Sequence, residues 1–162
     1  WAADTKDGAR HINARAETVA KQPSFRAAFK RRRCLVLADG YYEWRKEPGG
    51  AKKTPFLIRM KPAHPFAFAG LWETWESPDG SPIRTCTIIT TTPNDALAAI
   101  HDRMPVILAP CDYPAWLAQN EAEPAALAPL LRPYPEGEME AFAVSTLVNN
   151  PRNDDPRCIA PE

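Results

Sequence analysis

One short stretch of this 162-residue sequence, "HINARAET", places an amide and a guanidinium two positions apart, at Asn13 and Arg15. In an extended segment these two side chains lie on the same side of the backbone. The planar fork of Arg15 suits a phosphate or a carboxylate, so the pair could bind an anion. The alternative is that Asn13 caps a helix beginning at Ala14.

A carboxylate lies among large aromatic residues in "ADGYYEWRK", where Glu43 falls between Tyr42 and Trp44. Neighbouring rings exclude water and raise the pKa of a carboxyl group, which suits general acid–base catalysis. The alternative is an outward-facing residue on an alternating strand.

The stretch "AIHDRMPVIL" places His101 at the C-terminal end of a helix that is predicted to start near Pro93. The helix dipole favours imidazolium there, and histidine exchanges its proton near neutral pH. The alternative is that His101 only caps the last carbonyls of the helix. A further stretch, "VSTLVNNPRNDDP", holds Asn149 and Asn150, which are typical of turns.

Composition predicts one soluble globular domain over residues 1–162, because 44% of the residues are hydrophobic and 25% are charged. The net charge is zero, which argues against a strong nucleic-acid-binding field over the whole surface. A local basic groove is compatible with the run Lys30-Arg31-Arg32-Arg33, and so is a helix end that favours cations. No apolar run is long enough for a membrane span.

The cysteines, Cys34, Cys86, Cys111 and Cys158, form neither a C-x-x-C motif nor a zinc spacing. Cys34 and Cys86 lie in apolar runs, so we expect buried reduced thiols, a cytosolic compartment and no metal site. No G-x-S-x-G motif and no glycine-rich phosphate loop is present, and we expect no cofactor.

The elements that must position these groups are short. Strands are predicted at "RCLVLADG", a buried strand ended by a turn, and at "YYEWRK", "TPFLIRM", "FAFAGLW", "RTCTIIT", "PVILA" and "EAFAVST". Helices are predicted at "SFRAAFKRR" with Ser24 as the N-cap, "TPNDALAAIH" with Thr92 as the cap, "CDYPAWLAQ" and "EPAALAPLL". Strands joined by short connections indicate an α+β fold with a mainly antiparallel sheet or open barrel.

The ordered set of motifs resembles the SOS response-associated peptidase (SRAP) family, from Trp1 to about Pro161. The motifs that carry the resemblance are "INARAET", "SFRAAFKRRRCLVLADGYYEW", "TPFLI", "FAGLWE", "TIITTTPND", "IHDRMPVIL" and "VSTLVNN". The resemblance implies a single α+β domain around a distorted, mainly antiparallel β-barrel with short peripheral helices. It also implies binding of single-stranded DNA at abasic sites, by a monomer in the bacterial cytoplasm, associated with the nucleoid.

In this family a Cys follows the initiator Met, and its amine and thiol close a thiazolidine ring on the abasic aldehyde. By motif, the resemblance implies catalytic roles for Asn13, Glu43 and His101. Asn13 would position the Cys, Glu43 would shuttle protons, and His101 would hold the sugar or phosphate and assist reversal. It implies DNA contacts by Arg15, Arg26, Arg103 and a base-stacking Trp1.

The family begins Met-Cys-Gly-Arg several dozen residues before "INARAET", whereas twelve residues precede Asn13 here. We therefore expect the nucleophile and the first strands to be missing from this sequence. Two alternatives remain open. One is a thiol autopeptidase that trims its own N-terminus, and the other is a non-catalytic single-strand-binding module.

Overall fold

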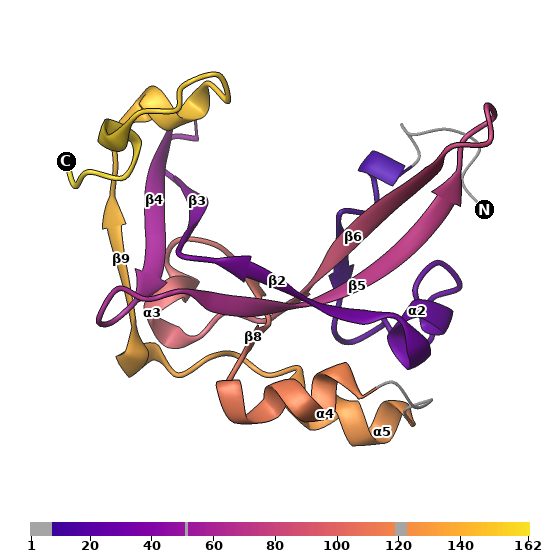
Figure 1. Cartoon of the computed structure of the whole chain (residues 1–162). Coiled ribbons are helices and arrows are strands. Elements are labelled where there is room, and N and C mark those ends of the chain that lie inside the picture. The colour runs from indigo at the N-terminus through magenta and orange to yellow at the C-terminus, as the bar shows by residue number, and fades with distance from the viewer. Residues whose placement is uncertain (1–7, 51, 119–122) are drawn as a thin grey trace. The chain divides into compact units, whose positions relative to one another are not determined.

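Two β-sheets carry the strands that the apolar runs predict. The computed structural model describes residues 8–50, 52–118 and 123–162 (Figure 1). One sheet has the strand order β1-β6-β5-β2, with β7 paired to β6 and β8 paired to β5; the other has the order β3-β4-β9. Their bounds are β1 (Asn13–Arg15), β2 (Arg33–Ala38), β3 (Tyr41–Lys46), β4 (Lys53–Met60), β5 (Phe66–Glu76), β6 (Pro82–Thr91), β7 (Met104–Pro105), β8 (Ile107–Leu108) and β9 (Met139–Ala143).

Most of these pairs are antiparallel, as the short connections indicate. The pairs β5–β6, β5–β8, β3–β4 and β4–β9 are antiparallel, whereas β1 runs parallel to β6. Figure 1 shows β3, β4 and β9 side by side. The α+β class is confirmed, while a single domain over 1–162 stays a prediction.

The helices are short and turn readily into 3₁₀ segments. The α-helices are α2 (Arg26–Arg31), α3 (Asp95–Ala98), α4 (Tyr113–Leu117) and α5 (Pro124–Leu127). The 3₁₀ segments are η1 (Pro110–Asp112), η2 (Ala128–Leu130), η3 (Glu136–Glu138), η4 (Thr146–Asn149) and η5 (Pro156–Cys158). Pro129 lies where α5 gives way to η2, because proline lacks the N–H that a continuing α-helix needs.

Both predicted helix caps are wrong. At α2 the N-cap is Phe25, whose ring has no hydrogen-bond acceptor for the helix start. A turn leads into α2, in which the backbone N–H groups of Phe25 and Arg26 bond to Gln22 O at 3.0 and 2.9 Å. At α3 the cap is Asn94, whose side chain accepts from Leu97 N at 3.1 Å. A preceding turn therefore replaces the Ser24 cap, and an amide replaces the Thr92 cap.

Contacts along the chain group into two compact units. The first unit comprises Trp1–Leu37, Ala67–Thr91 and Pro105–Pro133; the second comprises Ala38–Phe66, Thr92–Met104 and Tyr134–Glu162. The core of the first unit is apolar and almost fully buried, and it includes Val19, Phe29, Leu71, Ile89, Val106, Leu108 and Trp116.

Two glycines matter for the sheets. A Cβ on Gly70 would lie 2.8 Å from Val36 Cγ2 and 2.9 Å from Cys34 Sγ, so β2 and β5 approach closely only because this side chain is absent. In the β3–β4 turn, Gly49 adopts φ 95°, a conformation that glycine takes without strain.

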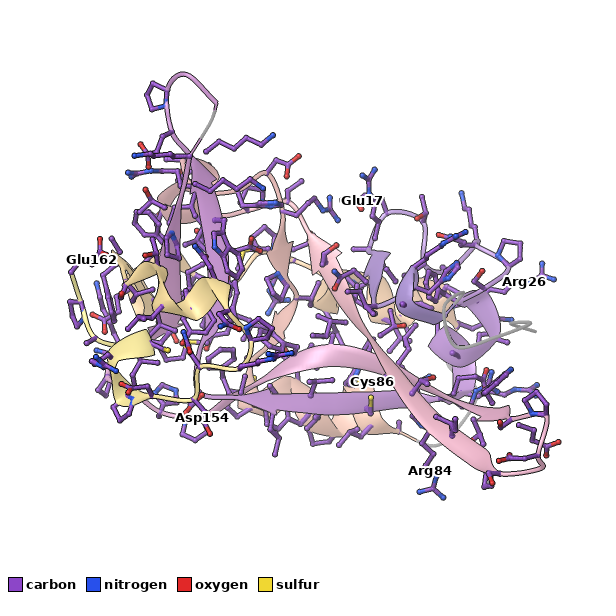
Figure 2. All side chains as sticks on the ribbon, turned by 90° about the horizontal axis from the view of Figure 1, so that it is seen from above. Glu17, Arg26, Arg84, Cys86, Asp154 and Glu162 are labelled. Atoms are coloured by element: carbon purple, nitrogen blue, oxygen red, sulfur yellow. The ribbon has the colours of Figure 1, made fainter. Side chains whose placement is uncertain are left out.

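Each of the four cysteines is a free thiol, as expected. The expectation that Cys34 and Cys86 are buried is wrong, because Cys34 is half-buried and Cys86 is exposed. Cys86 lies on β6 (labelled in Figure 2), where it pairs with the exposed Trp72 of β5. Within the described ranges, no helix is both long enough and apolar enough to cross a lipid bilayer.

Candidate functional site

Asn13 and Arg15 lie on β1, in the first unit. They pair in register with Ile88 and Thr90 of β6, and both are exposed while Ala14 between them is buried. This alternation places both polar side chains on the same side of the strand. The extended interpretation is therefore confirmed, and the prediction that Asn13 caps a helix is wrong.

The chain turns immediately after β1. Arg15 O accepts hydrogen bonds from Thr18 N at 3.0 Å and from Val19 N at 2.8 Å. Val19 is completely buried, so the turn is anchored in the core of the first unit. Arg15 is thus an exposed cation at the end of a fixed strand.

Glu43 lies in the middle of β3, in the second unit, directly opposite Phe56 of β4. Its side chain is 24% exposed. Burial raises the pKa of the Glu43 carboxyl group, while His101 and the Trp44 backbone N–H oppose that shift. The sequence prediction of a partly desolvated carboxylate with a raised pKa is therefore confirmed.

His101 follows α3, a helix fixed at its start by Asn94. The Asn94 side chain also donates to Tyr134 O at 2.8 Å, which ties α3 to the segment before β9. The His101 backbone N–H bonds to Leu97 O at 3.1 Å. With its backbone held in this way, the His101 Nε2 atom lies 4.0 Å from Oε2 of Glu43.

Polar groups of Asp102 and Arg103 surround the other ring nitrogen of His101. Nδ1 lies 3.1 Å from the Arg103 backbone N–H, which can donate only to an unprotonated nitrogen. It also lies 3.2 Å from Asp102 Oδ1 and 3.3 Å from the Arg103 carbonyl oxygen. These contacts hold the imidazole ring, and Nε2 faces Glu43.

A separation of 4.0 Å between Nε2 and Oε2 is too long for a direct hydrogen bond. One oxygen atom can, however, lie about 2.8 Å from each group and bond to both at once. A carboxyl group with a raised pKa and an imidazole then face the same oxygen, which is a suitable arrangement for moving protons to and from it.

The remaining predicted contact residues lie in different surroundings. Arg26 is exposed on α2, in the first unit, whereas Arg103 is half-buried beside His101, in the second. Asn149 is not a simple turn residue, because its Oδ1 accepts from Trp44 Nε1 at 2.7 Å. Trp1 lies outside the described residues.

Sequence reasoning missed two positioning residues, Asn94 and Asp102. The signals were present: Asn94 directly precedes an acidic helix start, and Asp102 directly follows the histidine. Among the residues that the structure describes, no cluster of three His, Cys, Asp or Glu side chains could hold a metal ion.

The chain was compared with known proteins. It is 48% identical over 160 residues to the abasic site processing protein YoqW of Bacillus subtilis (strain 168), covering 98% of this chain and 70% of the relative. It is 36% identical over 171 residues to the abasic site processing protein HMCES of Gallus gallus, covering 92% of this chain and 49% of the relative.

A solved structure and a family description agree with these relatives. A crystal structure of a protein from Bacteroides thetaiotaomicron superposes with a TM-score of 0.89 at 32% identity, covering 100% of this chain and 72% of that one. The family described as "SOS response associated peptidase (SRAP)" matches residues 1–151. The chain therefore belongs to the SRAP family.

Proposed function

We propose that the protein processes abasic sites in single-stranded DNA, with Glu43 and His101 as its acid–base pair. The observation that carries this proposal is the 4.0 Å separation between Glu43 Oε2 and His101 Nε2, together with the raised pKa of Glu43. Relatives named abasic site processing proteins support the choice of substrate.

The reaction we propose is a covalent one. The open-chain aldehyde of an abasic sugar is attacked by the α-amine of an N-terminal cysteine, which lies outside residues 1–162. Glu43 gives a proton to the oxygen of the resulting carbinolamine, which leaves as water, and the nitrogen returns a proton to the Glu43 carboxylate to yield an imine. The cysteine thiol then adds to the imine carbon and its proton passes to the nitrogen, closing a thiazolidine ring.

The other predicted residues have supporting roles in this proposal. His101 holds the sugar hydroxyl or the phosphate and assists reversal of the link, while Asn13 positions the cysteine. Arg15, Arg26 and Arg103 contact DNA phosphates, since a guanidinium forms strong charge-assisted hydrogen bonds with them. Trp1 stacks on a base, which is worth about 1–3 kcal/mol.

The test uses the full-length protein and an abasic oligonucleotide. A covalent adduct should appear on a denaturing gel and should disappear when the N-terminal cysteine is changed to alanine. The same strand without the abasic site is the control. Failure of the intact protein to form any adduct would overturn the proposal.

The family description contains the word peptidase, so self-processing is the second candidate function. Mass spectrometry of the mature N-terminus separates the two. Removal of a leader longer than the initiator Met would favour a peptidase. Equal affinity for intact and abasic strands, without an adduct, would instead favour a non-catalytic binding module.

A further inference from the structure

The β1-β6-β5-β2 sheet has one face that turns away from the core of the first unit. Ala14 of β1 is 2% exposed and belongs to that core, whereas Asn13 and Arg15 on either side of it are exposed. Because side chains alternate along a strand, Asn13 and Arg15 lie on the face opposite the core. Asn13 pairs with Ile88 of β6, so Ile88 shares this face.

Arg84 and Trp72 lie on the same face of the sheet. Arg84 and Cys86 precede Ile88 on β6 by four and two residues, so the three side chains share a face. Cys86 pairs with Trp72 of β5 in antiparallel register, and directly opposite side chains project to the same side of a sheet. Leu71, the residue before Trp72, is 2% exposed and belongs to the core, as this alternation requires.

The side chains of Trp72 and Arg84 are accessible. Trp72 is 39% exposed, although tryptophan is highly buried on average in folded proteins. Arg84 is exposed, and Figure 2 shows its side chain extending away from β6. An accessible indole offers a surface on which any base can stack, and a guanidinium binds a phosphate. We call Asn13, Arg15, Trp72 and Arg84 the outer face of this sheet.

Two arginines of the basic run Lys30-Arg31-Arg32-Arg33 have other roles. Arg33 is 7% exposed, and it donates from Nε to Trp116 O at 2.7 Å and from Nη1 to Phe29 O at 3.0 Å. Arg32 is paired, with its Nη2 2.5 Å from Oε2 of Glu73 on β5. Burial and pairing therefore occupy these two guanidinium groups.

The charges on this side of the sheet favour a nucleic acid as the occupant. Arg15 and Arg84 are cations placed on either side of Trp72 along the sheet. Glu76, the carboxylate on the same side of β5, pairs with Pro82 at the end of the hairpin, beyond Arg84. An aromatic side chain between cations is the arrangement by which proteins hold single-stranded nucleic acid.

The order of these side chains along the sheet fits a single strand of DNA. From the level of Asn13, Trp72 lies about 7 Å away along β6 and Arg84 about 13 Å away. Arg15 lies about 7 Å from Asn13 in the opposite direction. The two arginines are thus about 20 Å apart, a length that one DNA strand covers in about six nucleotides at a rise of about 3.4 Å.

We propose that Trp72 stacks on a base and Arg84 binds a phosphate of the single strand on one side of the abasic site. This proposal rests on the proposed function, in which Asn13 lies at the lesion, and it adds two residues to the expected DNA contacts. Because Arg15 lies on the other side of Asn13, Trp72 and Arg84 engage the nucleotides of one flank only. Stacking tolerates every base, so the two contacts increase affinity without selecting a sequence.

The main test is Trp72→Ala in the full-length protein, with binding followed by fluorescence anisotropy. Three strands of equal length carry an abasic analogue that lacks the aldehyde, placed at the 5′ end, at the 3′ end or in the middle. Affinity should fall by about 5- to 150-fold for the middle position and for one terminal position, and stay unchanged for the other. Trp72→Leu should lose as much affinity, whereas Trp72→Phe keeps an aromatic ring and should retain most of it.

Arg84→Gln tests the phosphate contact. Losing one contact to a single strand should lower the slope of log affinity against log salt by about 0.7, on the same strands that Trp72→Ala affects. Arg84→Lys keeps the charge and should keep the slope. The Trp72 variants should keep it too, because a stacked base releases no counterion.

Ile83→Ala is the matched control for Trp72. Ile83 is 38% exposed on β6 and pairs with Trp75, which places it on the opposite side of the sheet. Lys46→Gln, which removes an exposed charge from β3 in the second unit, is the control for Arg84. Both controls should bind as the wild type does, and thermal unfolding checks that every variant is folded.

A second readout does not depend on the alanine variant being folded. The tryptophan fluorescence of the wild type should fall when a strand binds, because a stacked base quenches the indole. The fall should be smaller in Trp72→Phe. Equal quenching in the two proteins would contradict the proposal.

Wild-type affinity of Trp72→Ala for all three strands would overturn the proposal, and so would an equal loss on all three. A lost dimer, or a large loss of stability, with unchanged DNA affinity would assign the outer face to a second copy or to the protein's own chain. Adduct formation by the wild type is measured in parallel. If the wild type forms no adduct while Trp72→Ala still loses affinity, the proposed function fails and the stacking contact stands.

Discussion

The two units hold their ionisable side chains in different surroundings. In the second unit, Glu43 and His101 are partly buried and face each other, and burial raises the pKa of Glu43. In the first unit, Arg15 and Arg84 are exposed on the outer face of the β1-β6-β5-β2 sheet. Chemistry requires a group whose proton affinity is adjusted by its environment, whereas phosphate attraction requires only a charge that stays accessible.

The largest expected effect tests whether Glu43, in the second unit, exchanges protons during adduct formation. Glu43→Gln keeps the shape of the side chain but removes its proton exchange, so adduct formation should slow by about 10²- to 10⁴-fold. DNA affinity should change little. Single-turnover adduct assays measure the rate, and anisotropy measures the binding. The control Glu76→Gln, an exposed carboxylate on β5, should leave the rate unchanged.

A parallel loss of rate and affinity in Glu43→Gln would contradict the separation of chemistry from binding. It would place Glu43 among the residues that hold DNA rather than among those that move protons.

The second prediction compares the contributions to stability of different residues in the basic run Lys30-Arg31-Arg32-Arg33. Arg33→Met leaves the carbonyls of Phe29 and Trp116 without their donor, so the free energy of unfolding should fall by about 3 kcal/mol. Lys30→Gln/Arg31→Gln should change it by no more than about 0.5 kcal/mol. Urea unfolding monitored by tryptophan fluorescence measures both variants. Equal losses in the two would mean that the run stabilises α2 as a whole.

The smallest effect concerns stability and pH at Glu43. The ordinary pKa of 4.5 is raised in the folded protein, so folded Glu43 keeps a proton that the unfolded chain has already released. The contribution of Glu43 to the free energy of unfolding is therefore lost as the pH rises from 4.5 through the raised pKa.

Glu43→Gln removes this loss. Relative to the wild type, the variant should become more stable as the pH rises through the same window, with no further gain above it. Urea unfolding at a series of pH values measures the difference. A stability difference that is constant with pH would show that ionised Glu43 costs the fold nothing.

The strands could be predicted from the sequence because each is a short apolar run between turn residues. "YYEWRK" matches β3 at both ends, and "RCLVLADG" matches β2 at its start, with the final Asp39-Gly40 forming the turn. The caps could not be predicted, because local rules favoured Ser24 and Thr92 while a preceding turn and the contact of Asn94 with Tyr134 decided the outcome. Local preference is weak wherever a tertiary contact competes with it.

The candidate site could be predicted only in part. The raised pKa of Glu43 was predicted, but not its cause, because Tyr42 and Trp44 point to the other face of the strand and burial within the fold raises the pKa instead. The approach of His101 to Glu43 could not be predicted, since the two are far apart along the chain and meet through the placement of α3. The contacts of His101 Nδ1 with Asp102 and Arg103 depend on backbone geometry at atomic scale, which no residue pattern specifies.

The buried position of Arg33 also determines which changes in length this region can accept. Arg33 begins β2, and side chains alternate between the two faces of a strand. Deleting a single residue from the basic run would keep a stretch of cations, yet it would shift β2 by one position and exchange its two faces. In an alignment of such proteins, substitutions should therefore be frequent at Lys30 and Arg31, while insertions and deletions between α2 and β2 should be almost absent.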